Sequence, residues 1–180
     1  STSNLGPGFD CLGLALGLYN DLTLEMHSEP GEPHVEIKGE GALSLPRGKD
    51  NLIARAAGLV VAGRTNKRLV FKAVNRIPLA RGLGSSSAAI VAGLFAANRL
   101  FSPAPLTDEQ LFQYAVGLEG HPDNIAPAIH GGLMVSVKNK ANFSVYPLKP
   151  HKDLAAVVCI PDFELSTSKA RAVLPKSVSR

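Results

Sequence analysis

The segment at residues 78–101 limits the possible folds of this chain more than any other, because a glycine-rich turn runs directly into a long apolar helix. The turn reads PLARGLGSSSAA, and the residues that follow it are apolar nearly all round. A helix without a polar face is buried, so residues 88–101 predict a helix inside the core. The residues just before the turn, RLVFKAVNR, predict a strand. The core is therefore expected to combine a strand with a buried helix.

The spacing of apolar residues predicts three more elements in the first part of the chain. Residues 21–27 alternate and predict a strand, and residues 33–39 alternate again and are expected to pair with it. Residues 51–63 have apolar residues at helical spacing and end in a glycine, which predicts a helix. The strands of this part look antiparallel.

Helical signals are stronger in the second part of the chain. Residues 107–119 predict a helix that opens with a capping box, because Gln110 follows Thr107 by three positions. A polar stretch with a proline interrupts this helix. Residues 131–137 then predict a strand, and residues 155–161 predict the first strand of another unit. Antiparallel-looking strands followed by helices indicate an α+β fold.

The glycine turn has the composition of a phosphate-binding loop. Gly82 and Gly84 let the backbone turn tightly and approach a ligand without a Cβ in the way. The serines at residues 85–87 stand at the predicted helix start, where backbone N–H groups lack partners and the helix dipole is positive. Such a site suits phosphate oxygens, although the Lys-Ser/Thr of a Walker A loop is missing. A capped buried helix is the alternative, but three serines exceed what one cap needs.

This stretch resembles the P-x-x-x-G-L-G-S-S-A-A signature of the GHMP small-molecule kinases. The resemblance implies that the loop wraps the phosphates of ATP and that Ser86 contacts Mg²⁺. Residues 51–53 resemble the loop that borders the adenine in this family, with a helix N-cap as the alternative. The ATP-binding residues implied are Asn51, Pro78, Arg81, Gly82, Leu83, Gly84, Ser85, Ser86 and Ser87.

Two further stretches resemble the homoserine kinase branch of this family. Residues 1–16 resemble its N-terminal motif, with Ser3 in place of the alanine before Asn4. Residues 119–132, EGHPDNIAPAIHGG, resemble its H-x-D-N-x-A-P segment, and residues 163–175 are a weaker match. The resemblance implies transfer of the γ-phosphate of ATP to the side-chain hydroxyl of L-homoserine, a step of threonine biosynthesis. Phosphorylation of another small alcohol and a catalytically silent sensor of the same fold are the alternatives.

The resemblance also implies roles for individual residues. Homoserine is a zwitterion, so its site needs an anion for the ammonium, a cation for the carboxylate and groups that orient the hydroxyl. A guanidinium suits the carboxylate because it binds in a bidentate way. The residues implied for the substrate are Asn4, Asp10, His121 and Arg171; those implied for catalysis are Asp123 and Asn124; those implied for Mg²⁺ are Ser86 and Glu119.

Each of these assignments has a structural alternative. Asp10 and the pair Asp123 and Asn124 could simply shape turns, and Glu119 could be an exposed residue at a helix end. Glu119 also lies closer to the H-x-D-N aspartate than the metal-binding glutamate does in some relatives. Whether Asp123 is a general base is open, because the matching aspartate has that role in mevalonate kinases, whereas homoserine kinases are thought to work without a strong base.

Composition argues against a nucleic-acid-binding or membrane-spanning protein and by itself selects no function. The formal net charge is +4 and the basic residues are scattered, so no nucleic-acid surface is expected. The longest apolar run, residues 88–97, is about half the roughly 20 residues that cross a bilayer. Cys11 and Cys159 lie in apolar surroundings and are expected to be reduced thiols in the core of a cytoplasmic protein. The oligomeric state is open, with a homodimer as one alternative.

We expect this chain to be part of a longer protein. Residue 1 opens directly on a loop, and a predicted helix near the end stops abruptly. One strand at the front and most of a second domain at the back are therefore expected to be missing. The resemblance implies an ATP-binding domain of the ribosomal-protein-S5 domain 2 type at residues 1–151, and the start of a ferredoxin-like domain at residues 152–180.

Overall fold

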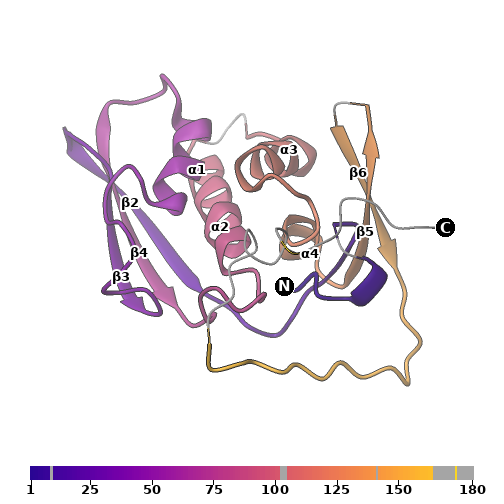
Figure 1. Cartoon of the computed structure of the whole chain (residues 1–180). Helices are drawn as coiled ribbons and strands as arrows, with labels where there is room; N and C mark the ends of the chain where they lie inside the picture. Colours follow the sequence, from indigo (N-terminus) through magenta and orange to yellow (C-terminus); the bar gives the residue numbers. More distant parts are fainter. Residues whose placement is uncertain (9, 102–104, 141, 164–172, 174–180) are drawn as a thin grey trace.

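Two small sheets enclose a layer of helices in this protein. The computed structural model describes residues 1–8, 10–101, 105–140, 142–163 and 173 of the 180-residue chain. Figure 1 shows one sheet on each side and the helices between them. The elements are the short 3-10 helix Gly6–Gly8, β1 (Leu12–Leu14), β2 (Asp21–Pro30), β3 (His34–Gly39), α1 (Leu52–Val61), β4 (Lys67–Asn75), α2 (Ser85–Leu100), α3 (Asp108–Glu119), α4 (Ile125–His130), β5 (Leu133–Asn139) and β6 (Asn142–Leu148).

The first sheet has the strand order β2–β4–β3, with β4 in the middle. β2 pairs with β4 in the antiparallel direction, whereas β3 pairs with β4 in the parallel direction. The predicted pairing of the first two strands with each other is therefore wrong. The physical reason lies in the connection through α1. Parallel strands need a long connection, usually a helix, and α1 lets the chain return from β3 to a parallel β4. β4 then lies between β3 and β2 and pairs with both.

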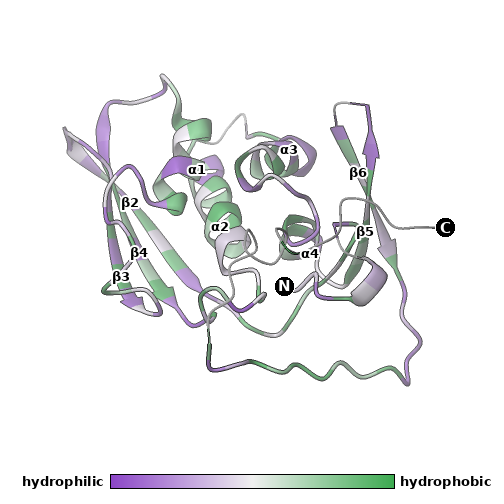
Figure 2. Ribbon diagram, in the orientation of Figure 1, coloured by the Kyte–Doolittle hydropathy of each residue, from purple (hydrophilic) through white to green (hydrophobic). Residues whose placement is uncertain are grey.

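Helix α2 is the centre of the core, as its apolar sequence predicts. It packs closely on α1, where a Cβ at Gly93 would lie 2.4 Å from the carbonyl oxygen of Ile53. Figure 2 shows hydrophobic residues along the helices and along the β2–β4–β3 sheet, and residues of both belong to one buried core cluster. Large side chains that are fully buried include Phe71, Ile77, Ile90, Leu94, Leu111, Phe112 and Ile125.

The second sheet has the order β1–β5–β6, with antiparallel pairing throughout. Only β5 is predicted by the sequence. β1 has three residues, which is too short for a visible alternation, and β6 contains Pro147, which weakens a strand pattern. The stretch interpreted as an interruption contains the short helix α4, which tolerates Pro127 because it lies in the first turn.

Residues 155–161, which are predicted to be a strand of another unit, are not a strand in the structure, and no strand of the described residues pairs with them. This segment runs from β6 back toward the start of α2 (Figure 1) and is exposed, with Val157 91% accessible. The prediction of two buried thiols is also wrong, because Cys11 and Cys159 are both free and exposed. Both cysteines lie in irregular segments, where apolar neighbours in sequence do not create a core.

Other expectations hold. The mixed helices and sheets confirm the α+β class. α3 begins with the predicted capping box, in which the Thr107 hydroxyl accepts from the Gln110 N–H and the Gln110 side chain accepts from the Thr107 N–H. Within the described residues, no helix is long and apolar enough to span a bilayer. The domain division at residue 151 stays a prediction, since most of the residues after 163 lie outside those described.

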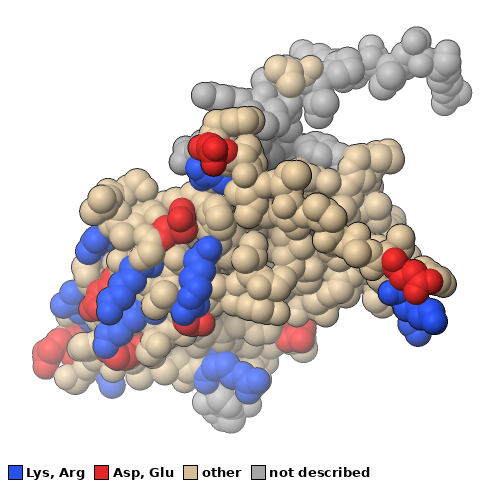
Figure 3. All heavy atoms as spheres, turned by 90° about the horizontal axis from the view of Figure 1, so that it is seen from below, with Lys and Arg blue, Asp and Glu red and all other residues tan. Residues whose placement is uncertain are grey.

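Charged side chains of both signs are interspersed on the surface. On the face drawn in Figure 3, Lys and Arg lie among Asp and Glu over the β2–β4–β3 sheet. Pairs such as Lys72 with Glu25 and Arg76 with Asp21 join the strands of this sheet. The basic residues on this face therefore do not form a patch of a single sign.

Candidate active site

A cavity of about 370 Å³ lies where the glycine turn enters α2. Its floor is the turn and the first residues of the helix. Its walls come from β3, from the segment before α1 and from the residues that follow α3. The residues that line it are Asn20, Ile37, Leu45, Pro46, Asp50, Asn51, Leu52, Ile53, Asn75, Pro78, Leu79, Ala80, Arg81, Gly82, Leu83, Gly84, Ser85, Ser86, Ala89, Glu119, His121 and Asn124.

The glycines of the turn are required by its geometry. Gly82 and Gly84 have φ values of 67° and 68°, in the left-handed region. A Cβ on Gly82 would lie 2.2 Å from Nδ2 of Asn4, and a Cβ on Gly84 would lie 2.3 Å from Oγ of Ser1. Gly84 is also the N-cap of α2 and has no side chain to satisfy the helix N–H groups. The free N–H groups of the first turn are thus left for a ligand in the cavity.

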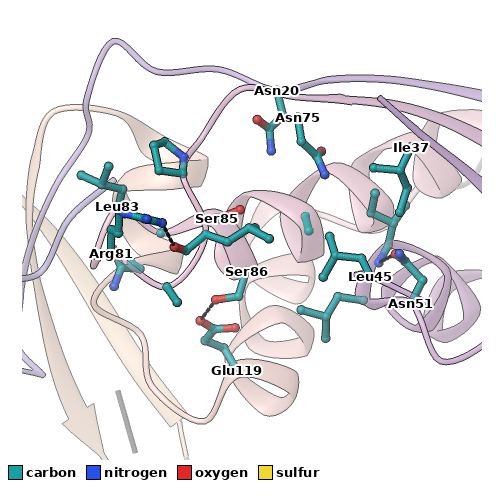
Figure 4. A pocket seen from close by; sticks show the side chains of 18 of the residues that line it. Asn20, Ile37, Leu45, Asn51, Asn75, Arg81, Leu83, Ser85, Ser86 and Glu119 are labelled. Carbon is teal, nitrogen blue, oxygen red and sulfur yellow. Dashed lines mark hydrogen bonds between the residues drawn. The ribbon is translucent and has the colours of Figure 1, made fainter. Parts of the chain in front are cut away.

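Ser86 and Glu119 meet at the edge of the cavity (Figure 4). The Ser86 hydroxyl donates to Oε1 of Glu119 at 2.5 Å, and the Ser87 hydroxyl donates to the same oxygen at 3.0 Å. Ser86 belongs to the first turn of α2, whereas Glu119 is the last residue of α3. Ser87 is fully buried and does not line the cavity, so it supports Glu119 from behind.

The donor set of this corner fits Mg²⁺. A hydroxyl and a carboxylate are hard oxygen ligands, and Mg²⁺ is typically bound by one or two carboxylates together with substrate phosphates rather than by a full protein cage. Among the described residues, no group of three or more His, Cys, Asp or Glu side chains could hold a metal ion. Ser86 and Glu119 therefore have the chemistry expected of magnesium ligands that act together with a nucleotide.

Behind the loop, His121 and Asp123 form a closely bonded pair. Nδ1 of His121 lies 2.6 Å from Oδ1 of Asp123, and the Asn124 N–H donates to the same oxygen at 2.8 Å. Asp123 is 1% exposed and does not line the cavity, whereas His121 and Asn124 do. The arrangement presents a histidine and an amide to the cavity and keeps the carboxylate beneath them.

The environment of Asp123 favours the ionised form. Burial by itself raises the pKa of this carboxyl group, but the hydrogen bond and the charge of His121, the Asn124 N–H and the Ser3 hydroxyl act in the opposite direction. The net effect is a pKa below the ordinary value of 3.8. Asp123 is therefore a carboxylate at neutral pH and a weaker base than an exposed aspartate.

Two serines at the start of the chain complete this polar cluster. The Asn124 side chain donates to Oγ of Ser3 at 3.0 Å, and the Ser1 hydroxyl lies within hydrogen-bond distance of both oxygens of Asn124. Both serines are buried. Sequence reasoning did not select Ser1 or Ser3 as site residues, although Ser3 was the position that departs from the N-terminal motif.

The far wall of the cavity is apolar with amide groups at its rim (Figure 4). Ile37 and Leu45 supply part of the apolar surface. Asn20 and Asn75 also line the cavity, and the sequence analysis did not select them as site residues. Asn51 is both a lining residue and the N-cap of α1, with Oδ1 accepting from the Ile53 N–H at 2.9 Å and Nδ2 donating to the Pro46 carbonyl at 2.7 Å. The N-cap interpretation is confirmed, whereas the assignment of Asn51 to a nucleotide site stays a prediction.

The remaining predicted residues are spread around this centre. Pro78, Leu83 and Ser85 line the cavity. Asn4 lies against Gly82 in a neighbouring cavity. Asp10, at a φ of 64°, lines a smaller opening together with His121. Arg81 lines the main cavity but donates to backbone carbonyl groups. Arg171 lies outside the described residues.

Several known proteins are similar to this chain in sequence. Residues 51–132 match the family described as GHMP kinases N terminal domain. The homoserine kinase of Synechocystis sp. is 43% identical over 186 residues, covering 100% of this chain and 60% of that protein. The homoserine kinase of Moorella thermoacetica is 45% identical over 180 residues, covering 99% of this chain and 60% of that protein. The chain thus spans about 60% of the length of the curated relatives it matches.

A solved structure agrees with these matches. The crystal structure of homoserine kinase from Cytophaga hutchinsonii superimposes with a TM-score of 0.81 at 25% identity, covering 99% of this chain and 58% of that chain. The superposition extends over both sheets and the helices between them, because it includes nearly every residue of this chain. The likeness supports the fold inferred from the elements and their order.

Proposed function

Because this chain belongs to the GHMP kinase family, we propose that its full-length protein transfers the γ-phosphate of ATP to the side-chain hydroxyl of L-homoserine. The chain would supply the nucleotide site and part of the homoserine site. One observation carries the proposal: the N-terminus of α2, the Ser86–Glu119 pair and the side chains of His121 and Asn124 all face a single cavity. A phosphate donor and a small acceptor would meet there.

The loop would hold the phosphates through its backbone. The free N–H groups of the first turn of α2 and its dipole attract anionic oxygens, and the glycines at 82 and 84 let those oxygens approach. Ser86 and Glu119 would hold Mg²⁺ together with the phosphates. When bound, Mg²⁺ neutralises the charge that develops on the phosphoryl oxygens.

Phosphoryl transfer requires positioning more than covalent chemistry from the protein. The hydroxyl oxygen of the acceptor forms a bond to the γ-phosphorus as the bond to the bridging oxygen of ADP breaks. Asn124 would orient that hydroxyl, because its amide lies at the edge of the cavity and is itself held by Ser1 and Ser3. The hydroxyl proton would leave to a phosphate oxygen or to water.

Asp123 would act as a positioning residue rather than as a base. It is buried beneath the cavity and its pKa is lowered, so it lacks both access to the hydroxyl and affinity for the proton. Its bond to Nδ1 fixes the ring orientation of His121 and aims the other ring nitrogen. His121 would then donate to the substrate carboxylate, while Asp10, near the same histidine, would bind the ammonium.

The test is an ADP-release assay on the full-length protein with Mg²⁺ and four acceptors: L-homoserine, mevalonate, shikimate and galactose. Turnover confined to L-homoserine supports the proposal. Turnover with a different alcohol keeps the kinase assignment and removes the substrate roles given to Asn4, Asp10, His121 and Arg171. No turnover with any acceptor while ATP still binds would overturn the catalytic assignment. A cytoplasmic location and a homodimer stay predictions, which fractionation and light scattering would check.

A further inference from the structure

Arg81 has an unusual position in the glycine turn. Its guanidinium donates to three backbone carbonyl groups: Nε to Pro161 at 2.8 Å, Nη1 to Leu79 at 2.9 Å and Nη2 to Asp162 at 3.2 Å. One of these acceptors belongs to the turn itself. The other two belong to the segment that follows β6, about 80 residues further along the chain.

That segment, residues 155–163, is weakly attached elsewhere. In the part of the chain that the structure describes, the two bonds from Arg81 are the hydrogen bonds that join it to the rest of the protein. A cavity of about 300 Å³ separates it from the turn, with Leu83 on one wall and Cys159 on the other. Its apolar side chains are exposed to different degrees, from 43% for Val158 to 91% for Val157. None of the described residues of this segment belongs to the buried core, so the guanidinium is the main polar link between the segment and the turn.

We infer that Arg81 is a positioning residue that couples the phosphate loop to residues 155–163, and not a ligand of the nucleotide phosphates. The bond to Leu79 holds the turn in its curved shape immediately before Gly82. The bonds to Pro161 and Asp162 hold the segment against that same turn. A change in the shape of the loop on binding ATP would therefore move the segment, and a change in the segment would alter the loop. This inference rests on the proposed function for its nucleotide, but the link itself does not depend on turnover.

The chemistry of arginine fits this role. A guanidinium carries five N–H groups in one plane and can bind several acceptors at fixed angles, whereas the ammonium of lysine is a single point charge. A lysine at this position would keep the positive charge but could not reach the three carbonyl groups together. Replacement by lysine thus separates the two possible roles of Arg81. Binding of phosphate depends on the positive charge, which lysine keeps, whereas the link between the turn and residues 155–163 depends on the several N–H groups of the guanidinium, which lysine lacks.

The experiment uses the full-length protein with a nitroxide on Cys159, which lies in the segment and is exposed, and with every other cysteine, Cys11 included, replaced by serine. Arg81→Lys and Arg81→Ala are compared with Arg76→Ala, a control that removes an exposed guanidinium five residues earlier. We expect faster nitroxide motion in both Arg81 variants and no change in the control. A non-hydrolysable ATP analogue should restrict the nitroxide in the protein that keeps Arg81 and not in either variant.

The kinetic measurements should likewise separate the two Arg81 variants from the Arg76→Ala control. KM for ATP should rise about tenfold in both Arg81→Lys and Arg81→Ala, the effect of losing roughly one charge-assisted hydrogen bond. If Arg81→Lys keeps the KM of the parent protein and its nitroxide motion, Arg81 acts through its charge and the inference fails. The nitroxide measurement does not require turnover. A protein that phosphorylates none of the acceptors would therefore refute the proposed function, whereas the link through Arg81 would still be tested by the nitroxide motion in the Arg81 variants.

Discussion

The Ser86 hydroxyl lies 2.5 Å from Oε1 of Glu119, although the two residues are 33 positions apart. Ser86 opens α2 and Glu119 closes α3, so the antiparallel packing of these two helices brings a helix start and a helix end to one corner. The sequence resemblance implied that these two residues share a metal ion. In the structure both residues line the cavity beside the glycine turn, and a shared metal ion stays part of the proposal.

Glu119→Gln should lower kcat/KM by about 100-fold to 1000-fold and raise the Mg²⁺ concentration needed for half-maximal activity, because a carboxylate ligand contributes several kcal/mol to binding a hard cation. A Mg²⁺ titration of the ADP-release assay measures both effects. Glu109→Gln is the matched control, since Glu109 lies in the exposed first turn of the same helix. An unchanged Mg²⁺ requirement in Glu119→Gln would exclude this residue as a ligand.

Asp123→Asn should reduce turnover without abolishing it. The amide oxygen can still accept one of the bonds from His121 and Asn124, but the charge that orients the histidine is lost. We expect a larger effect on KM for homoserine than on kcat, because His121 would contact the substrate and not the transferred phosphoryl group. A drop in kcat of several orders of magnitude, with KM unchanged, would instead show that Asp123 takes the proton.

The same carboxylate should make stability depend on pH at acid values. Because the pKa of Asp123 is lower in the folded protein than its ordinary value of 3.8, ionised Asp123 stabilises the fold above that value. This contribution is lost as the pH falls through the lower, folded pKa. The difference in the free energy of unfolding between the parent protein and Asp123→Asn should be constant near neutral pH and shrink below about pH 4. Urea unfolding at several pH values tests this, and a difference that grows on acidification would contradict it.

Gly84→Ala should destabilise the protein by about 1–3 kcal/mol, because the left-handed backbone disfavours a Cβ. That Cβ would also lie 2.3 Å from Oγ of Ser1. ATP binding should weaken as well, since the substitution changes the start of α2. Gly117→Ala is the control: it lies within α3, where a Cβ meets nothing within 4 Å, and should stabilise the helix by about 1 kcal/mol. Thermal unfolding with and without ATP compares the two, and equal stability of both variants would refute the strain argument.

Asn51→Ala should cost about 1 kcal/mol, the usual value of an N-cap. The side chain both caps α1 and holds the Pro46 carbonyl, which borders the cavity. We therefore expect KM for ATP to rise together with the loss of stability. If urea unfolding shows the loss while KM stays the same, Asn51 is a cap alone and its assignment to the nucleotide site is wrong.

Local signals in the sequence were sufficient where neighbouring residues decide the structure. The glycines at 82 and 84 have the left-handed backbone that their residue type predicts, and Thr107 and Gln110 form the capping box that their spacing predicts. The apolar character of α2 similarly predicted its central place in the core. These features depend on a few adjacent residues, so they can be recognised without any knowledge of the rest of the chain.

Features that join distant segments were not visible in the sequence. The position of β4 between β2 and β3 depends on the crossover through α1, and alternation alone cannot tell which strands are neighbours. The exposure of Cys159 and the missing strand at residues 155–161 have the same origin. Apolar residues form a strand only where another strand offers hydrogen-bond partners.

The motifs in the sequence determined which residue types this protein brings to its candidate site: glycines and serines of a kind suited to a phosphate, a glutamate of a kind suited to a cation, and a histidine, an aspartate and an asparagine close together. Only the tertiary structure decided which of them face the cavity. Asp123 lies beneath it, Ser87 behind it and Arg81 across from residues 161–162. The reason is physical: the types of side chains are set one by one along the chain, whereas burial and hydrogen-bond partners are set by how helices and sheets pack.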